Sequence, residues 1–316
     1  MTAPLKAPFP WFGGKSRAGA LIWDAFGAVA NYVEPFAGSL AVLLARPTPP
    51  GTETVCDADC YLANFWRAVK TCPDEVAEWC DWPVNEADLH ARHRWLVDRS
   101  EFRELMKTDP EFYDSKIAGW WVWGLCSWIG SGWCAPRERG DGHPPKQLPH
   151  LGSAGRGIHR KRPPLGSAGR GEIAAWMRAL SDRLRRVRVA CGDWTRVLGE
   201  SVTVKHGVTG ILLDPPYPDG ADDLYAEHDK SLSGAVREWA VEAGGIPGVR
   251  IALCGYEGEH EMPDGWSVVE WKANGGYGSQ REDGSNDNAK RERIWFSPAC
   301  LSARQASLFD RREVAP

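Results

Sequence analysis

The sequence has no strong excess of charge of either sign. Its 38 lysines and arginines stand against 42 acidic residues, which gives a formal net charge of −4. This balance argues against a uniformly basic nucleic-acid binder. Hydrophobic residues make up 43% of the chain and charged residues 25%, so neither global disorder nor a fibrous repeat is expected. The length of 316 residues predicts one large domain or two modest ones.

Signals for export and for disulfide bonding are also absent. The nine cysteines include no CxxC pair, and their odd number leaves at least one thiol unpaired within the chain. The first residues contain no apolar h-region and no small-residue cleavage site. We therefore expect free thiols and a cytoplasmic protein.

The sequence offers one uncharged stretch that is long enough to cross a membrane, Ile117–Pro136. It contains four glycines and five tryptophans but few aliphatic residues. This composition favours a Trp-rich surface or core over lipid, so no membrane partner is expected.

Two parts of the chain alternate between helical and strand patterns. In the first part, strands are expected at 32–34 and 53–56 and helices at 17–26, 40–44 and 62–70. The alternation resumes later, with strands expected at 187–190, 210–213, 250–253, 267–271 and 294–296. Strands that alternate with helices predict a parallel sheet with helical crossovers.

The segment between these parts has a different composition. Residues 75–135 are helical, polar and Trp-rich, and residues 136–171 are rich in Gly, Pro and Arg. The heptapeptide LGSAGRG occurs at 151–157 and again at 165–171, too short a repeat for a solenoid, and predicts two similar loops. A helix with a basic face is expected at 172–184. The economical architecture is an α/β domain with an inserted, mainly helical and basic module.

The inserted module holds a local excess of positive charge. Residues 137–188 contain thirteen Lys or Arg and four acids, a local charge of +9, which leaves −13 for the rest of the chain. The predicted domains are a catalytic domain at 1–74 and 187–300, an inserted DNA-binding region at 75–186 and a flexible tail at 301–316.

The strongest chemical signal is the run ILLDPPY at residues 211–217. Three aliphatic residues predict a buried parallel strand that two prolines end, which places Asp214 and Tyr217 beyond its carboxyl end, where open α/β sheets bind ligands. The Asp214 carboxylate and the Pro215 carbonyl can each accept a hydrogen bond from one amino group, and the Tyr217 ring can stack on a base. An ordinary exit from a strand into a loop is the alternative interpretation.

Three further stretches accompany this motif. Residues 33–39, VEPFAGS, predict a strand that turns tightly into a helix, where Gly38 lets the backbone approach a ligand. Asp57 ends the next predicted strand, where nucleoside-binding sheets commonly place a carboxylate for the ribose hydroxyls. Residues 10–16, PWFGGKS, contain an aromatic residue, two glycines and a cation. They do not form a phosphate loop for ATP, because Phe9 stands where its first glycine is needed.

Together these stretches resemble the DNA adenine-N6 methyltransferases of the type that includes the bacterial adenine methylase acting at short palindromes. The resemblance covers residues 8–70 and 187–230, with a weaker likeness to about residue 298. It implies a Rossmann-like α/β sheet that binds S-adenosylmethionine, with an inserted target-recognition module. It also implies a prokaryotic or phage enzyme that methylates adenine N6 in double-stranded DNA.

The resemblance implies a role for individual residues. Asp214, Pro215 and Tyr217 would hold the target base. Asp214 would also border the cofactor, whose other expected contacts are Trp11 and Lys15 at the methionine part, Phe36 and Gly38 at the pocket floor, Asp57 at the ribose and Asp193 at the adenine amino group. No metal is implied.

The implied reaction is a direct displacement at the methyl group. The N6 lone pair is delocalised into the adenine ring, and the acceptors at Asp214 and Pro215 would favour positive charge on N6 during the attack. No prior deprotonation is then needed. The base is inaccessible inside a duplex, so base flipping is expected, with Tyr217 stacking on the extruded ring.

The chain departs from the family pattern at two places. Leu40 stands where the family usually has a second glycine, two positions after Gly38. Residues 123–126, WGLC, keep only the Gly-Leu pair of a recognition loop that is usually rich in Asn and Arg. The target sequence of the best-known members therefore does not transfer to this chain.

Two other functions stay open. One is methylation of cytosine N4 or of another nucleic acid. The aspartate before Pro-Pro-Tyr, in place of a serine, favours adenine over cytosine. The other is a DNA-binding protein that keeps the fold with little turnover. Leu40 leaves room for this second alternative, whereas the intact Asp57 and Asp214 count against it.

Basic residues set among glycines are the predicted DNA contacts, through the phosphate backbone. The alternative is a solvated linker, although such a segment can become ordered on DNA. The five tryptophans between residues 120 and 133 are more typical of core packing than of base stacking. The predicted contacts are Arg137, Arg139, Lys146, Arg156, Arg160, Lys161, Arg162 and Arg170.

The tail contains QASLFD at residues 305–310. This run resembles the short peptide by which bacterial replication and repair proteins dock on the sliding clamp, so Gln305, Leu308 and Phe309 are the expected anchors. A tail that folds back on its own domain is the alternative.

Overall fold

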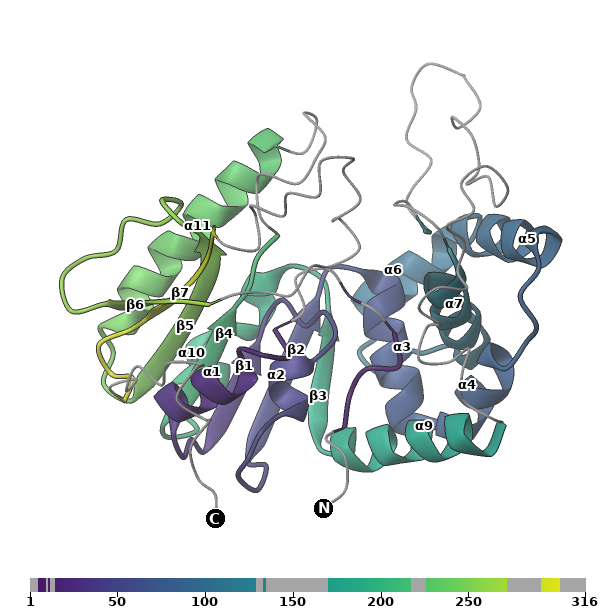
Figure 1. The fold of residues 1–316 in the computed structure, drawn as a ribbon, viewed down its shortest axis with the longest axis horizontal. Helices are drawn as coiled ribbons and strands as arrows, with labels where there is room; N and C mark the ends of the chain where they lie inside the picture. Colours follow the sequence, from purple (N-terminus) through teal and green to yellow (C-terminus); the bar gives the residue numbers. More distant parts are fainter. Residues whose placement is uncertain are drawn as a thin grey trace, which may run out of the picture. The chain divides into compact units, whose positions relative to one another are not determined.

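A seven-stranded sheet runs through the fold (Figure 1), with the strands in the order β3-β2-β1-β4-β5-β7-β6. The computed structural model describes residues 5–9, 11, 15–128, 133–134, 170–216, 226–271 and 291–301. The strands are β1 (Asn31–Glu34), β2 (Thr52–Asp57), β3 (Val187–Cys191), β4 (Thr209–Leu213), β5 (Val249–Tyr256), β6 (Ser267–Glu270) and β7 (Glu292–Phe296).

The sheet is mostly parallel. Strand β1 pairs in parallel with β2 and with β4, and β4 pairs in parallel with β5. The expected α/β class and Rossmann-like sheet are confirmed. The expectation of a parallel sheet is wrong at one edge, because β7 runs antiparallel between β5 and β6. Antiparallel neighbours need no crossover helix, so the alternation of strands with helices does not reveal this edge.

The helices agree with the expected segments to within a few residues at α1, α2, α3 and α9. A helix of 19 residues, α11, had no counterpart among the expected segments. The helices are α1 (Gly19–Phe26), α2 (Ala41–Leu44), α3 (Cys60–Thr71), α4 (Pro73–Cys80), α5 (Glu86–Val97), α6 (Ser100–Thr108), α7 (Ser115–Ser127), α9 (Arg170–Leu184), α10 (Glu200–Thr203) and α11 (Ala226–Gly244), with a 3-10 turn, η2, at Trp194–Val197.

The chain divides into two compact units. Unit 1 comprises residues 1–11 and 56–193, and unit 2 comprises residues 12–55 and 194–316. The division falls inside β2, so this strand contributes residues to both units. The predicted functional boundaries near residues 74 and 186 stay a prediction, because compactness does not identify a functional domain.

Unit 1 is built around packed helices. Helix α7 packs against α3, α4 and α5, and α9 packs against α3 and α4. Gly119 of α7 permits the contact with α4, since an added Cβ would collide with the side chain and backbone of Trp79. Arg67 of α3 is 6% exposed and donates hydrogen bonds to the backbone carbonyls of Val189, Met106, Asp109 and Phe112.

Two aspartates fix the ends of these helices. The Asp59 side chain accepts hydrogen bonds from the backbone N–H groups of Tyr61 and Leu62 at the start of α3. Asp114 accepts from the N–H of Ile117 at the start of α7. Both satisfy backbone donors that a helix start leaves without partners, which stabilises each helix by roughly 1 kcal/mol.

Unit 2 has its own apolar core beneath the sheet. Trp23 and Phe26 of α1 pack with Tyr32 of β1, and all three are almost fully buried. Strand β4 is buried along its whole length, as expected for a central parallel strand. Helix α11 packs on β5, as Figure 1 shows.

Two further observations concern the cysteines and the membrane. All nine cysteines are free thiols. Among the residues that the structure describes, no helix combines the length and the apolar character needed to cross a membrane.

Candidate active site

The order of the sheet reverses between β1 and β4, and both strands end in unit 2. The two strands are parallel neighbours, with Val33 opposite Ile211. In the sheet, β2 and then β3 follow β1 on one side, whereas β5 follows β4 on the other side. Open α/β sheets bind ligands at such a reversal, beyond the carboxyl ends of the strands. The residues that follow Glu34 and Leu213 therefore lie where a ligand site is expected.

Asp214 follows β4 and forms an ion pair with Lys15. The Nζ atom of Lys15 lies 2.9 Å from Oδ1 of Asp214. The Lys15 side chain is 3% exposed, whereas that of Asp214 is 20% exposed. Pro215, the next residue, is buried. The structure thus encloses the ammonium group and leaves the carboxylate within reach of a ligand.

A second carboxylate and an indole ring also border Lys15. Oε2 of Glu292, the first residue of β7, lies 3.7 Å from Nζ, and the ring centre of Trp271 lies 5.5 Å from Nζ. Burial alone would lower the pKa of Lys15, but the surrounding acidic groups, with Asp214 foremost, raise it above its ordinary value. Lys15 therefore carries its charge at neutral pH.

Sequence reasoning missed Glu292 and Trp271. All five residues of β7 are buried, and Glu292 opens this strand with a carboxylate. Two charged residues, Glu292 and Arg293, directly before three apolar ones were the available signal, because buried charges are normally paired.

A second buried polar group lies on β1. The Tyr32 hydroxyl donates a hydrogen bond of 3.0 Å to Oε2 of Glu34. Burial and the charge of Glu34 raise the pKa of Tyr32 well above its ordinary value. Burial likewise raises the pKa of the Cys254 thiol on β5, so this thiol is neutral at pH 7. Glu34 belongs to the EPF run, and its place at the end of a buried strand was a signal that sequence reasoning did not use.

The loop after β1 holds two residues with left-handed backbone conformations. Gly38 has a φ of 47° and Leu40 a φ of 54°. Such a conformation costs a residue with a side chain about 1–2 kcal/mol. The Leu40 side chain is fully buried, and that burial opposes the cost. Leu40 thus keeps the backbone conformation that a glycine would adopt more readily.

Phe36, in the same loop, packs against the 3-10 turn. Its ring stacks on Trp194, with ring centres 6.1 Å apart and planes 23° apart. Phe36, Gly38, Lys15 and Asp214 are all residues of unit 2.

The other predicted cofactor residues belong to unit 1. The backbone carbonyl of Asp57, at the end of β2, accepts a hydrogen bond of 2.9 Å from the N–H of Gly192. Asp193 comes next in the chain and is exposed. This bond brings the two predicted acids, Asp57 and Asp193, onto adjoining segments of the same unit.

Trp11 is also in unit 1. Its ring centre lies 5.9 Å from that of Phe9 and 6.4 Å from that of Trp121. Trp11 therefore joins an aromatic cluster of this unit, which does not test its predicted contact with the cofactor.

Several predicted site residues lie outside the described residues. Arg170 is described only as the first residue of α9. The others are Tyr217, Arg137, Arg139, Lys146, Arg156, Arg160, Lys161, Arg162, Gln305, Leu308 and Phe309.

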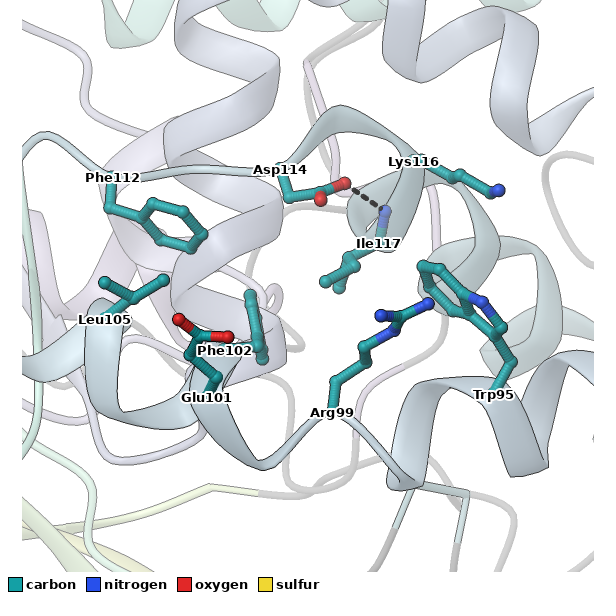
Figure 2. A pocket seen from close by; sticks show the side chains of 9 residues that line it. All are labelled: Trp95, Arg99, Glu101, Phe102, Leu105, Phe112, Asp114, Lys116 and Ile117. Carbon is teal, nitrogen blue, oxygen red and sulfur yellow. Dashed lines mark hydrogen bonds between the residues drawn. The ribbon is translucent and has the colours of Figure 1, made fainter.

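A hollow of about 270 Å³ lies in unit 1 among residues of α5, α6 and α7 (Figure 2). The Arg99 guanidinium lies over the Trp95 ring, 3.9 Å from its centre. Phe102, Phe112 and Ile117 add apolar side chains to the lining. The hollow contains no residue that the sequence predicts for the cofactor or the target base. Among the described residues, no cluster of three or more His, Cys, Asp or Glu side chains is arranged to hold a metal ion.

Comparison with known families identifies the first third of the chain. Residues 11–114 match the family model described as D12 class N6 adenine-specific DNA methyltransferase. The matched segment contains Trp11, Lys15, Phe36, Gly38 and Asp57. Comparison with curated proteins found no matching sequence. Over residues 11–114 the chain is therefore similar to the D12 class of N6 adenine-specific DNA methyltransferases, which are enzymes.

Proposed function

We propose that the chain transfers a methyl group from S-adenosylmethionine to the exocyclic N6 of adenine in double-stranded DNA. The family of residues 11–114 supports the reaction and DNA as the substrate. One observation carries the assignment of residues in unit 2. The carboxylate of Asp214 lies beyond β4, at the reversal of strand order, and an enclosed Lys15 holds it in place.

The target amine is the group that Asp214 and Pro215 recognise. An amino group has two N–H donors, which the Asp214 carboxylate and the Pro215 carbonyl can accept. In the transfer, the N6 lone pair forms a bond to the methyl carbon while the carbon–sulfur bond breaks and its electron pair stays on sulfur. N6 becomes positively charged and then releases one proton to water. The negative charge of Asp214 stabilises the positive charge that develops on N6.

The residues present fit S-adenosylmethionine by their chemistry. Gly38 adopts a φ of 47°, which turns the loop after β1 sharply and removes the side chain where a ligand would approach. Phe36 offers an aromatic surface, and Asp57 and Asp193 offer carboxylates for hydroxyl and amino groups. With Trp11 and Lys15, these are the residues proposed to hold the cofactor. When bound, it supplies an electrophilic methyl group.

The proposed route to the target base includes flipping, because N6 cannot be attacked inside a stacked duplex. Tyr217 is proposed to stack on the extruded base, and the basic residues of 137–170 to contact phosphates. The tail anchors Gln305, Leu308 and Phe309 are proposed to dock on a sliding clamp. Titration of a peptide of residues 300–316 with the clamp tests this last proposal, and absence of binding overturns it.

A product analysis tests the proposed function. The protein is incubated with duplex DNA and a methyl-labelled donor, and the DNA is digested to nucleosides. Labelled N6-methyladenine that disappears in Asp214→Ala supports the proposal. Labelled N4-methylcytosine would instead establish the alternative base, and DNA binding without methyl transfer by the unaltered protein would establish a binding protein.

A further inference from the structure

Glu292 is a buried carboxylate whose hydrogen bonding is incomplete. The residue is 6% exposed, and within the described part of the chain its Oε2 atom has no hydrogen-bond partner. The Nζ of Lys15 lies 3.7 Å from Oε2, beyond hydrogen-bond distance. An enclosed carboxylate with an incomplete set of partners is costly, so its presence here calls for an explanation.

The neighbouring Trp271 strengthens this observation. Its backbone N–H donates to the Glu292 carbonyl at 3.4 Å, and its indole lies beside Lys15. The indole Nε1, which is also buried, has no hydrogen-bond partner among the described residues. One unpartnered acceptor and one unpartnered donor thus flank the same ammonium group.

The charges around Lys15 do not cancel. Lys15 contributes one positive charge, and Asp214 and Glu292 each contribute a negative charge when ionised. Without Glu292, Lys15 and Asp214 would together present a net charge of zero to the target base. With Glu292, the three groups carry a net charge of −1. The neutral thiol of Cys254 adds no charge.

We infer that Glu292 is a positioning residue for methyl transfer, which helps to hold Lys15 beside Asp214 and keeps the group of three charges negative. This inference rests on the proposed function. N6 gains positive charge only as the transition state forms, so a net negative charge stabilises the transition state more than the bound substrate. Glu292 therefore acts on the rate of transfer rather than on the binding of DNA or cofactor.

The size of the effect follows from Coulomb interaction inside a protein. One charge removed at a separation of roughly 8–10 Å, in a medium of effective dielectric constant about 20, changes a rate by about 10- to 100-fold. The expected loss in Glu292→Gln is in this range, with the KM values for donor and DNA changed by less than about 2-fold.

A pH profile distinguishes this role from a structural one. Burial raises the pKa of Glu292, and the Lys15 ammonium offsets this only in part. As the pH falls, protonation of Glu292 removes its charge, so the single-turnover rate should decline at a higher pH than an ordinary glutamate would cause, and this decline should be absent in Glu292→Gln. Among the described residues, the titratable groups that interact electrostatically with this cluster are Lys15, Tyr32, Glu34, Asp214 and Cys254.

The experiment compares single-turnover methylation by the wild type, Glu292→Gln and Glu292→Asp from pH 5 to pH 8. Glu270→Gln is the matched control, because it removes a carboxylate from the adjacent strand β6 where the side chain is 80% exposed. The expected rates fall in the order wild type, Glu292→Asp, Glu292→Gln, with the control unchanged. Circular dichroism confirms that each variant is folded.

Several results would overturn the inference. They are a rate in folded Glu292→Gln within about 2-fold of the wild type, a rise in KM without a loss of rate, or an equal loss in Glu292→Asp. Should Glu292→Gln fail to fold, the wild-type profile decides, because a rate that shows no decline with falling pH contradicts the inference. Absence of N6-methyladenine from the wild-type reaction would refute the proposed function instead.

Discussion

The Nζ of Lys15 and the Oδ1 of Asp214 form a 2.9 Å ion pair, although one residue precedes the first helix and the other follows the fourth strand. The pair lies beyond the strand β4, in unit 2. Lys15 is almost fully enclosed and Asp214 is partly exposed. The ion pair therefore fixes the position of a carboxylate that a ligand can reach.

Removal of the Lys15 charge should destabilise the protein and weaken catalysis together. Lys15→Met would leave Asp214 and Glu292 close together without their cation, and breaking a buried ion pair costs about 3–5 kcal/mol. Chemical denaturation should show that the free energy of unfolding falls by an amount near the lower end of this range, because Asp214 is partly exposed. Unchanged stability would contradict the burial of this pair.

The contribution of Lys15 should not vary with pH near neutrality. Its pKa is raised in the folded protein, so the stabilisation is complete below the unfolded pKa of about 10.4 and disappears only as the pH rises through the higher folded value. The free-energy difference between wild type and Lys15→Met should lack a Lys15 titration step between pH 6 and pH 9. Denaturation curves across this range measure it.

At Leu40, a glycine variant should be more stable than an alanine variant, the reverse of the usual order. Both Leu40→Gly and Leu40→Ala remove a fully buried side chain, which costs about 2–5 kcal/mol. Leu40 has a φ of 54°, which glycine adopts freely and alanine does not. Leu40→Gly should therefore be more stable than Leu40→Ala by about 1 kcal/mol. The opposite order in thermal denaturation would show that the loop has another conformation.

Two glycines in helices should respond in opposite directions to alanine. Gly119→Ala of α7 should destabilise unit 1 by at least about 1–3 kcal/mol, because the new methyl group collides with Trp79. Gly234→Ala of α11 meets no atom within 4 Å and should stabilise the protein by about 0.5–1 kcal/mol. Equal effects of both substitutions would contradict the close approach of α4 and α7.

The affinity for DNA should depend steeply on salt through the basic segment. Each phosphate contact contributes about −0.9 to the slope of log affinity against log salt concentration. Replacement of Arg160, Lys161 and Arg162 by Gln should reduce the magnitude of that slope by about 2–3. Lys205→Gln, an exposed lysine of unit 2, is the control and should leave it unchanged. An unchanged slope in the triple variant would remove this segment from the DNA contacts.

Local patterns were sufficient for β4 and the residues that follow it. Three consecutive aliphatic residues before two prolines predict both the buried strand and the position of Asp214, since proline ends the strand within the same short stretch. The alternation of strands with helices likewise predicted β1, β2 and α3. These signals are local in the chain.

Other features depend on contacts between distant residues. Glu292 borders Lys15 only because β7 pairs antiparallel with β5, and an antiparallel edge leaves no mark in the alternation of elements. Helix α11 carried a readable signal, because Ser233, Val236, Ala240 and Ala243 are buried at helical spacing. Its charged and glycine-containing composition obscured that periodicity.

Leu40 shows how a departure from the family's sequence pattern can be accommodated in the structure. The family resemblance implies a glycine where the chain has Leu40, and the structure has there the left-handed conformation that glycine favours. Whether the loop tolerates leucine depends on burial of the side chain, which single-residue patterns do not report.

The role of Asp214 in methyl transfer can be tested by the rate of N6-methyladenine formation by Asp214→Asn under single-turnover conditions, with circular dichroism and DNA binding as controls. The substitution keeps the shape of the side chain and removes the negative charge opposite the target amine. We expect a folded, DNA-binding protein whose rate is lower by at least about 10²- to 10³-fold. A rate within a few-fold of the wild type would contradict the central role of Asp214.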